Sequence, residues 1–505
     1  MTVFKNILYA ILLVQLTACA AVGPDFVKPD VELPETWSTD SIENSRNMLQ
    51  SSPVEQRQWW QMFNDPVLNQ LVETAWQQNH SLEIAGLRIL EARARLGIAQ
   101  GLSFPQTQAA SGSAVRVSPT GNTGTPSFWQ GSLSLGATWE MDFWGRFQRG
   151  IESADAAYMA SIEARNQVVL LLTAQVVDSY LVLRINEELL RVAHENAALQ
   201  QRSYDIARVL FRNGSTSELD MQQAQTLLLS TKASIPGYEV AIKKARNALS
   251  VLLGKPPGAV DTLLHGRGSI PVVPEHIEVG IPADLLRQRP DVHQAELVAM
   301  AQNARVGLAE ADLYPSFSLS GSIGLAAGGL AGGAFADLFG ANALTYSVGP
   351  SFVWPFLNYG RIRNNIRVQD AQLQQALVQY REVVIQAARE VEDAMTSLAG
   401  SRAQVAIMQK TVVSAQRSNN ISLLRYKEGF SSYQRVLDSQ KSLFKQQQTL
   451  ISVRGASVRN LVALYKALGG SWDAPADLIS DESRQQMKTR TDWGDLLEHD
   501  QRRAQ

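Results

Sequence analysis

Cysteine is almost absent from this 505-residue sequence, which excludes a disulfide framework. The only cysteine is Cys19, so no cluster of cysteines is available to hold a metal ion. The six histidines and ten methionines are scattered without ligand spacing, and there is no glycine-rich phosphate loop. Because no catalytic or ligand-binding constellation stands out, we expect neither an enzyme nor a protein that carries a metal or another cofactor.

An excess of charge of one sign and an N-terminal apolar run of membrane-spanning length are also missing. The chain carries 46 Lys and Arg against 48 Asp and Glu, so its net charge does not indicate a nucleic-acid partner. The N-terminal run ILYAILLV has far fewer than the roughly 20 apolar residues that span a bilayer. Because MTVFK precedes this run and LTAC follows it, residues 1–18 are predicted to be an export signal.

The sole cysteine stands at the end of this signal. The sequence LTAC, which ends at Cys19, resembles a bacterial lipobox, in which the cysteine becomes the lipidated first residue of the mature protein. Ala20 is not the aspartate that often marks inner-membrane retention, so the resemblance implies a covalent lipid in the outer membrane. Such a lipid anchors a chain but does not make it cross the membrane. The alternative is an ordinary signal peptide with a chance cysteine.

The chain contains an internal repeat. WGRFQR (144–149) and YGRIRN (359–364) are 215 positions apart, whereas ARLGIAQ (94–100) and ARVGLAE (304–310) are 210 apart. The five extra residues fall at a Gly-rich loop, where insertions are tolerated. We therefore expect one duplicated unit. The predicted divisions are an N-terminal lipidated segment (19–66), a first repeat (67–254), a linker (255–284), a second repeat (285–470) and a polar, partly disordered tail (471–505).

Four segments of about ten residues alternate between apolar and small polar side chains. SLSLGATWEM (132–141) and SFSLSGSIGL (316–325) show this most clearly; TQAASGSAVRV (107–117) and TYSVGPSFVW (345–354) are weaker, the last because of Pro350. The pattern predicts two β-hairpins, at about 107–141 and 316–354. Such strands suit a transmembrane barrel that is apolar towards lipid and polar towards a wet lumen. A soluble sheet with one buried face is the alternative.

The remainder of each repeat is predicted to be helical. From Arg361 to Glu428 proline is absent and glycine nearly so, and apolar residues recur every three or four positions. Ile151–Asn213 is the equivalent segment of the first repeat, and at about 1.5 Å per residue each helix would extend roughly 95–100 Å. Short breaks at Gly214 and Gly429 then precede returning helices (219–253 and 434–468).

Four strands cannot close a barrel, because a sheet in a bilayer must leave no open edge and the smallest closed ones have about eight strands. Two copies would give eight strands, whose interior fills with side chains, whereas three copies leave a lumen. We therefore predict a mixed α and β membrane protein. It is a trimeric 12-stranded transmembrane β-barrel, with four strands per chain, continued by a long α-helical barrel.

With this arrangement the chain resembles the outer-membrane efflux factor family, of the TolC and OprM kind, and in particular its lipoprotein branch. The resemblance covers the chain from Cys19 to about Trp472. It is carried, in order, by the lipobox, GPDFVKP (23–29), WWQMFNDPVL (59–68), the WGR and YGR turns, and YKEGFSSYQRVLDSQ (426–440). It implies a homotrimer in the outer membrane whose helical barrel crosses the periplasm.

The resemblance also implies partners and a function. A periplasmic adaptor (membrane fusion) protein would connect the channel to an inner-membrane RND-type transporter. The expected function is to export drugs or other small toxic compounds to the exterior. One alternative is the exit duct of a type I protein secretion system. Another is a structural coiled-coil lipoprotein, which would explain the long helices but not the four alternating strands.

A constriction is implied at the inner end of the tunnel, formed by the turns at Gly214 and Gly429. Position by position, the resemblance matches Asp438 to the ring carboxylate of the family. Three copies of Asp438 around an axis would attract cations and repel one another, which raises some of their pKa values. The alternative is that Asp438 is one more solvated carboxylate on a polar helix face.

Other residues near Asp438 follow from the same match. Gln434 falls where related lipoproteins often carry an apolar gate residue, and Arg435 falls where TolC has a second acid. Tyr426 matches a tyrosine that helps to hold the closed state, and Lys441 matches a basic partner. An apolar gate and a double ring of carboxylates are therefore not expected in this chain.

The paired Gly-Arg turns are predicted to join a strand to a long helix. Gly145 and Gly360 would allow the sharp reversal of the backbone, because glycine adopts conformations closed to other residues. Arg146 and Arg361 would either pair with a neighbouring chain or stand exposed at the start of each helix.

Overall fold

The structure, a computed structural model, divides into two compact units, and each unit takes segments from both repeats. Residues 88–162 and 294–381 with the N-terminal segment form the first unit, and the rest of the chain forms the second. The predicted signal (1–18) and Cys19 lie outside the described residues, as does much of each Gly-rich loop. The residues described are 21–32, 49–50, 58–118, 127–264, 268–274, 277–278, 289–328, 335–470 and 477–497.

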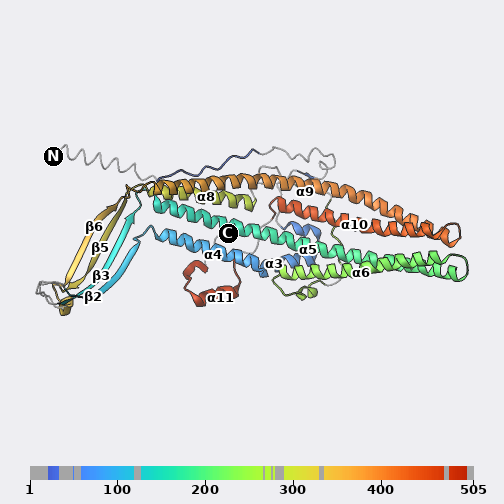
Figure 1. Ribbon diagram of the computed structural model, residues 1–505, viewed down its shortest axis with the longest axis horizontal. Helices are drawn as coiled ribbons and strands as arrows, with labels where there is room; N and C mark the ends of the chain where they lie inside the picture. Colours follow the sequence, from blue (N-terminus) through green and yellow to red (C-terminus); the bar gives the residue numbers. More distant parts are fainter. Residues whose placement is uncertain are drawn as a thin grey trace. The chain divides into compact units, whose positions relative to one another are not determined.

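A four-stranded antiparallel sheet belongs to the first unit. Its strands, β2 (Thr107–Val117), β3 (Phe128–Met141), β5 (Ser316–Ala327) and β6 (Leu344–Val353), lie in the order β2-β3-β5-β6 (Figure 1). The central pair, β3 and β5, joins the two repeats, with Leu135 opposite Ile323. Pro350 lies in the edge strand β6, where a missing backbone N–H is tolerated. The predicted number of four strands per chain is confirmed.

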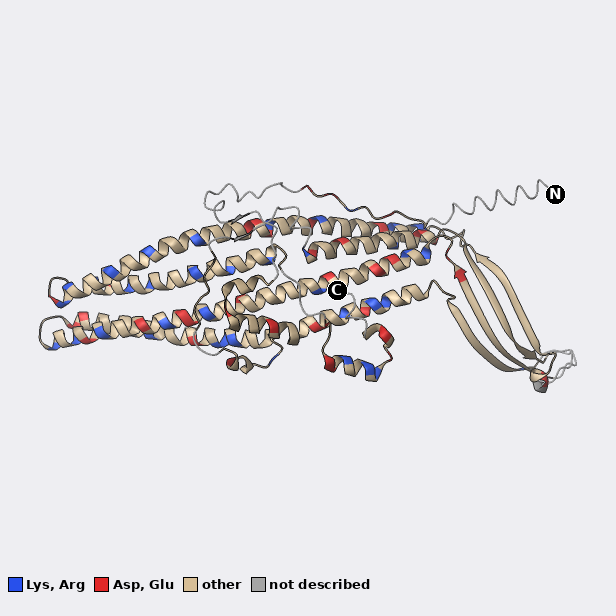
Figure 2. Ribbon diagram, turned by 180° about the vertical axis from the view of Figure 1, so that it is seen from behind, with Lys and Arg blue, Asp and Glu red and all other residues tan. Residues whose placement is uncertain are grey.

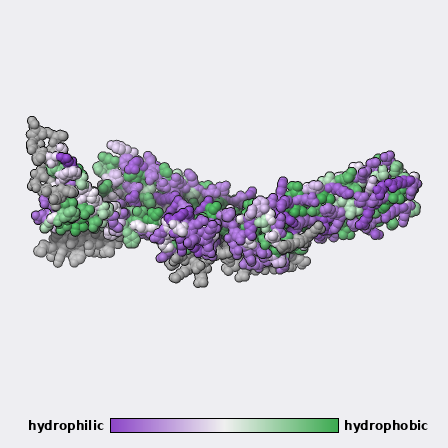
Figure 3. All heavy atoms as spheres, turned by 90° about the horizontal axis from the view of Figure 1, so that it is seen from below, coloured by the Kyte–Doolittle hydropathy of each residue, from purple (hydrophilic) through white to green (hydrophobic). Residues whose placement is uncertain are grey.

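The two faces of this sheet differ as the alternation predicts. On one face, serine hydroxyls of neighbouring strands hydrogen-bond to each other, at 2.9 Å between Ser111 and Ser134 and 2.9 Å between Ser322 and Ser347. On the other, apolar side chains stand exposed in rows across the sheet. Charged residues are nearly absent from the strands (Figure 2). In the face shown in Figure 3, apolar residues gather over the sheet.

The helices of the two repeats match in length. The longest, α5 (Arg146–Arg212) and α9 (Arg361–Lys427), have 67 residues each. They are followed by α6 (Glu218–Leu252) and α10 (Tyr433–Ala467), with 35 residues each. Before the hairpins lie α4 (His80–Gly101) and α8 (Pro290–Ala311), with 22 each. The repeat seen in the sequence is therefore also a repeat of structure.

Equivalent residues make equivalent hydrogen bonds. The indole of Trp139 donates to the carbonyl of Ser103, and the indole of Trp354 donates to the carbonyl of Leu313. The side chain of Asn79 donates to the carbonyl of the last residue of α6, and the side chain of Arg289 donates to the carbonyl of the last residue of α10. These pairs keep the two offsets found in the sequence, so the duplicated unit retains its internal packing.

The core of the second unit lies where α3, α5, α6, α9 and α10 pack together. Helix α3 (Pro66–Gln78) begins at Asp65, whose carboxylate accepts hydrogen bonds from the backbone N–H groups of Val67 and Leu68. Of the described helices, α5 is the one whose length and composition would allow it to cross a membrane. Because 61% of its apolar window is buried inside the chain, packing against the other helices already accounts for that composition.

Short elements complete the second unit. The linker contributes a 3-10 helix, η3 (Ala259–Thr262), and strand β4 (Ile277–Glu278), which pairs in parallel with β1 (Leu49–Gln50). Another 3-10 helix, η2 (Trp59–Phe63), precedes α3, and in the first unit η4 (Phe335–Phe339) precedes β6.

The C-terminal tail differs from the expectation of partial disorder over residues 477–497. This segment forms α11 (Asp481–Arg490) and the 3-10 helix η5 (Gly494–Leu497). Its apolar side chains Ile479, Met487 and Leu497 are buried. Glycine at position 86 makes room for it, because a Cβ there would overlap the carbonyl of Leu478. The segment is polar overall, but these three buried apolar side chains hold it against the rest of the second unit.

We expect the docking of this tail to depend on pH through Glu83. Its carboxylate accepts hydrogen bonds from Ser480 and, at 2.7 Å, from the hydroxyl of Ser483, and these bonds lower the pKa of Glu83 below its usual 4.5. A carboxyl group whose pKa is lowered by folding stabilises the folded form above its unfolded pKa and loses that contribution as the pH falls through the folded value. Limited proteolysis of the tail should therefore accelerate as the pH falls below about 4.5.

The matched variants are Glu83→Gln and Glu91→Gln. Glu83→Gln should accelerate cleavage of the tail at neutral pH and flatten the pH profile, because the group that titrates is gone. Glu91 forms an exposed pair with Arg95 at 2.6 Å, so its replacement should change little. An unchanged pH profile in Glu83→Gln would show that another group controls the docking.

Candidate functional site

The two turns predicted to form the inner end of the tunnel have the same backbone conformation. Gly214 has a φ of 72° and Gly429 a φ of 78°, in the left-handed region that favours glycine. In each turn the next residue donates back to the helix, from Ser215 to Leu210 at 2.8 Å and from Phe430 to Arg425 at 2.9 Å. Glycine is therefore required in both turns to end the long helix.

Asp438 lies on the exposed side of α10. Its carboxylate accepts a hydrogen bond of 3.0 Å from the amide of Gln434, one turn earlier. Lys441 is exposed, and among the described residues neither it nor Arg435 forms an ion pair with Asp438 within 4.0 Å. Within the part of the chain that the structure describes, Asp438 therefore has no cation in direct contact. Its membership of a ring stays a prediction.

Tyr426 is buried within its own chain. Its ring packs edge-on against Tyr433, at 5.1 Å between centroids. Burial raises the pKa of Tyr426; the hydroxyl of Thr216 acts in the opposite direction, and the carboxylate of Asp220 raises it further. Tyr433, Thr216 and Asp220 were not predicted from the sequence. Tyr433 is seven residues from Tyr426, but the two lie on different helices separated by a turn. Helical periodicity therefore could not predict that they are in contact.

The tips of the two helical hairpins pack on each other through this tyrosine pair. The cluster consists of Ala207, Ala224, Leu227, Tyr426, Tyr433, Val436 and Leu437. Further along the same helices, buried amides cross from α10 to α5, with Gln440 donating to Ser203 at 2.6 Å and Asn196 donating to Gln447 at 2.7 Å. The contact between the helical hairpins within one chain therefore rests on an aromatic cluster and two polar contacts.

Two further amides in this region are buried without partners among the described residues. Both polar atoms of the side chains of Gln200 and Asn419 lack a hydrogen bond. A buried polar group left unpaired costs about 1–3 kcal/mol. These two amides therefore lower the local stability of the helical hairpins.

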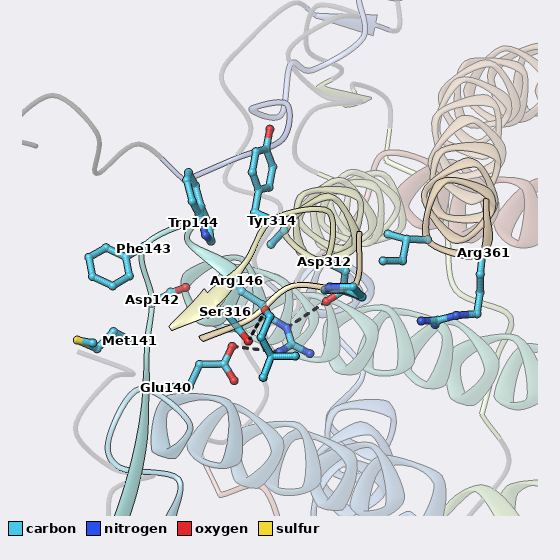
Figure 4. Close-up of a pocket in the computed structure, with 14 residues that line it drawn as sticks. Glu140, Met141, Asp142, Phe143, Trp144, Arg146, Asp312, Tyr314, Ser316 and Arg361 are labelled. Carbon is cyan, nitrogen blue, oxygen red and sulfur yellow. Dashed lines mark hydrogen bonds and ion pairs between the residues drawn. The ribbon is translucent and has the colours of Figure 1, made fainter. Parts of the chain in front are cut away.

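The strand-helix junctions belong to the first unit. Gly145 has a φ of 73° and Gly360 a φ of 81°, so each reverses the backbone as predicted. Arg146 lies between Glu140 and Asp312, at 3.4 Å and 3.5 Å (Figure 4). These residues line a cavity of about 270 Å³ together with Arg361. Arg146 therefore has partners within its own chain, whereas the pairing of Arg361 with a neighbouring chain stays a prediction.

The segment after Cys19 docks at the first of these junctions, which the sequence did not predict. The buried guanidinium of Arg149 donates to the carbonyls of Val22 and Gly23, each at 3.1 Å, and pairs with Asp25 at 2.9 Å. Gly145 has a second role here, because a Cβ at this position would overlap Ala21. The conspicuous GPDFVKP segment is thus an internal docking sequence.

Among the described residues, no group of three or more His, Cys, Asp and Glu side chains is arranged to hold a metal ion. The acidic residues of the junction instead pair with arginine.

A profile of the family described as outer membrane efflux protein matches residues 71–255 and 281–470 of this chain. The chain belongs to the outer membrane efflux protein family. The matched residues include both strand hairpins, all four long helices and every candidate site residue except Cys19. The protein is accordingly a channel of the outer membrane, and the predicted family is confirmed.

Individual relatives cover nearly the whole chain. The cation efflux system protein CusC of Escherichia coli K12 is 30% identical over 457 residues, which are 90% of this chain and 97% of CusC. The solvent efflux pump outer membrane protein SrpC of Pseudomonas putida is 30% identical over 480 residues, 93% of this chain and 98% of SrpC.

Solved structures agree with this family. The outer-membrane channel OprN superposes with a TM-score of 0.83 at 29% identity, covering 90% of this chain and all of OprN. The open-state structure of the MtrE outer membrane channel of Neisseria gonorrhoeae superposes with a TM-score of 0.78 at 26% identity, covering 91% of this chain and all of MtrE. The fold of this chain is therefore that of an outer-membrane channel.

Proposed function

We propose that this protein is the outer-membrane exit channel of a tripartite efflux system and works as a homotrimer. The observation that carries the proposal is a four-stranded sheet with two open edges, β2 and β6, in a chain of this family. Open edges are not tolerated in a bilayer, because lipid cannot hydrogen-bond the free backbone groups. Three copies would join β6 of one chain to β2 of the next and make a twelve-stranded barrel with a lumen.

The partners and cargo of the proposal follow from the family. A periplasmic adaptor protein and an inner-membrane RND-type transporter would deliver the cargo, which we take to be drugs or other small toxic compounds. The names of the relatives agree on efflux but not on a substrate, since CusC is named for cations and SrpC for solvents.

A lipid on Cys19 would add an anchor in the outer membrane. Ala21, two residues later, lies against Gly145, where β3 gives way to α5. If the strands cross the bilayer, the junction is at the membrane surface, so a lipid attached to Cys19 would enter the adjacent leaflet. A Cys19→Ser variant followed by labelling of cells with a radioactive fatty acid tests this step.

The constriction is proposed at Asp438. Its exposure, and the absence of an ion-pair partner among the described residues, support a role towards other copies, because three such carboxylates would concentrate negative charge. Gln434 would extend the polar ring, and Tyr426 would hold the hairpin tips in the closed state by packing on Tyr433.

The test is single-channel conductance of the purified protein in planar bilayers. Wild type should conduct rarely, and Asp438→Ala should open more often or wider because the charged ring is removed. Gln223→Ala is the matched control, since Gln223 is the equivalent residue of the first repeat. A stable trimer whose conductance is unchanged in Asp438→Ala would move the constriction elsewhere. Failure to form a trimer or any channel would contradict the proposed function itself.

A further inference from the structure

The two strand-helix junctions carry the same Gly-Arg motif but have different surroundings. In the first repeat, Trp144 stacks on Tyr314 with 4.6 Å between ring centroids, and the N-terminal segment covers the start of α5. In the second repeat, the equivalent Tyr359 is 99% exposed. Tyr359 also has a φ of 49°, which is rare for an aromatic residue and costs free energy. Within a single chain, the second junction is therefore open where the first is filled.

The charges at the start of the long helices differ as well. Arg363 and Arg367 lie one turn apart on α9, and both are exposed. Their equivalents on α5 are Gln148 and Glu152, and Glu152 is paired with Arg149 at 2.8 Å. Among the described residues neither Arg363 nor Arg367 forms an ion pair; Arg367 donates only to the amide of Asn364, at 3.0 Å.

An unpaired cation in the first turns of a helix is unfavourable, because the helix dipole is positive there. The second repeat nevertheless places Arg363 in the first turn of α9 and Arg367 in the second, and the next acid on α9 is Asp370. An external anion bound beside these arginines would offset this cost.

Apolar surface lies directly beside these arginines. A cavity of about 580 Å³ is lined by Arg363 and by exposed side chains of the segment that connects β6 to α9, including Trp354, Phe356, Leu357 and Tyr359. Basic side chains next to exposed aromatic rings are typical of a membrane surface, where the rings lie at headgroup level. An anionic headgroup with an apolar tail would satisfy both parts of this surface.

By the offsets of the repeat, a neighbouring copy has no equivalent of the acids that pair with Arg146. The position of Asp312 is taken by Leu102 in the first repeat, and that of Glu140 is taken by Pro355 in the second. Residues 92–106, which a neighbouring copy would bring by the same logic, contain two arginines and no acid. Charge complementarity therefore favours lipid over a second copy.

We propose that Arg363 and Arg367, with the exposed aromatic segment Trp354–Tyr359, bind the phosphate headgroup of an anionic phospholipid at the periplasmic surface of the outer membrane. The inference rests on the proposed function, because it requires the strands to cross the bilayer. Phosphate oxygens would bind the two guanidinium groups, and the acyl chains would pack on the aromatic side chains.

The test is native mass spectrometry of the full chain in detergent, with phosphatidylglycerol or phosphatidylethanolamine added. Wild type should retain phosphatidylglycerol about 25-fold more than phosphatidylethanolamine, since each of the two arginines contributes a factor of about five towards an anionic lipid. Arg363→Gln combined with Arg367→Gln should abolish this preference. The control is Arg417→Gln combined with Arg425→Gln, which removes two exposed arginines further along α9 and should leave it intact.

The outcomes separate this inference from the proposed function. Inorganic phosphate at millimolar concentration, added as a soluble competitor, should displace little phosphatidylglycerol. Complete displacement would show that the site binds phosphate alone, and it would overturn the lipid assignment. A wild-type trimer that conducts but shows no preference for phosphatidylglycerol, or a double variant that keeps the preference, would overturn the inference alone. A wild type that neither assembles nor conducts would overturn the proposed function.

Discussion

Replacing Arg289 by methionine should destabilise the second unit by about 3 kcal/mol, because it leaves two partly exposed carboxylates and a backbone carbonyl without their partner. The guanidinium is 4% exposed, pairs with Asp291 at 2.6 Å and Glu390 at 2.9 Å, and donates to the carbonyl of Ala467 at 2.7 Å. Urea unfolding of the detergent-solubilised protein, followed by helical circular dichroism, measures the loss.

The repeat supplies a control for this variant. Asn79 occupies the equivalent position and donates to the carbonyl of Leu252 at 2.9 Å, but it carries no charge. Asn79→Ala should therefore cost only about 1–2 kcal/mol, since it removes a neutral hydrogen bond and a helix cap. Adding Asp291→Asn and Glu390→Gln to Arg289→Met should restore part of the loss. Equal effects of the Arg289 and Asn79 variants would show that the buried ion pairs contribute little.

Replacing Tyr433 by alanine should loosen the tips of the helical hairpins, with a local loss of about 3–5 kcal/mol. The side chain is 1% exposed, and it fills the cluster in which both hairpins meet. Hydrogen exchange of residues 204–227 and 423–440 should accelerate, and channel openings should become more frequent.

Glu218→Ala is the matched variant, because Glu218 is the residue of the first repeat equivalent to Tyr433 and is exposed. It should leave both exchange and conductance close to wild type. Fast exchange without more frequent opening in Tyr433→Ala would separate the packing of the tips from the constriction. Unchanged exchange would contradict the role assigned to the tyrosine pair.

The local elements followed closely from sequence patterns. The period of two in 316–325 predicted a strand, and β5 covers Ser316–Ala327. The proline-free stretch from Arg361 to Glu428 predicted one helix, and α9 ends at Lys427. Such predictions succeed because hydrogen bonds within a helix, and the alternation of side chains along a strand, depend on neighbours in the sequence.

The candidate site was predictable only in part. The turn glycines and the exposed position of Asp438 could be located from the repeat and the family resemblance. The partners of Tyr426 and Arg146 could not, because Tyr433 follows a turn and Asp312 comes from the other repeat. The docking of residues 477–497 was missed because only three apolar side chains anchor that segment.

By itself the sequence determined the duplicated unit, the four strands, the long helices and the family, since each depends on local spacing or on motifs in a given order. The tertiary structure alone decided that β3 pairs with β5 across the repeats, that Arg149 binds the segment after Cys19, and that one Gly-Arg junction is filled while the other is open. These features depend on which surfaces fit together in space. Contacts between residues more than 100 positions apart are set by shape and charge complementarity, which no local pattern contains.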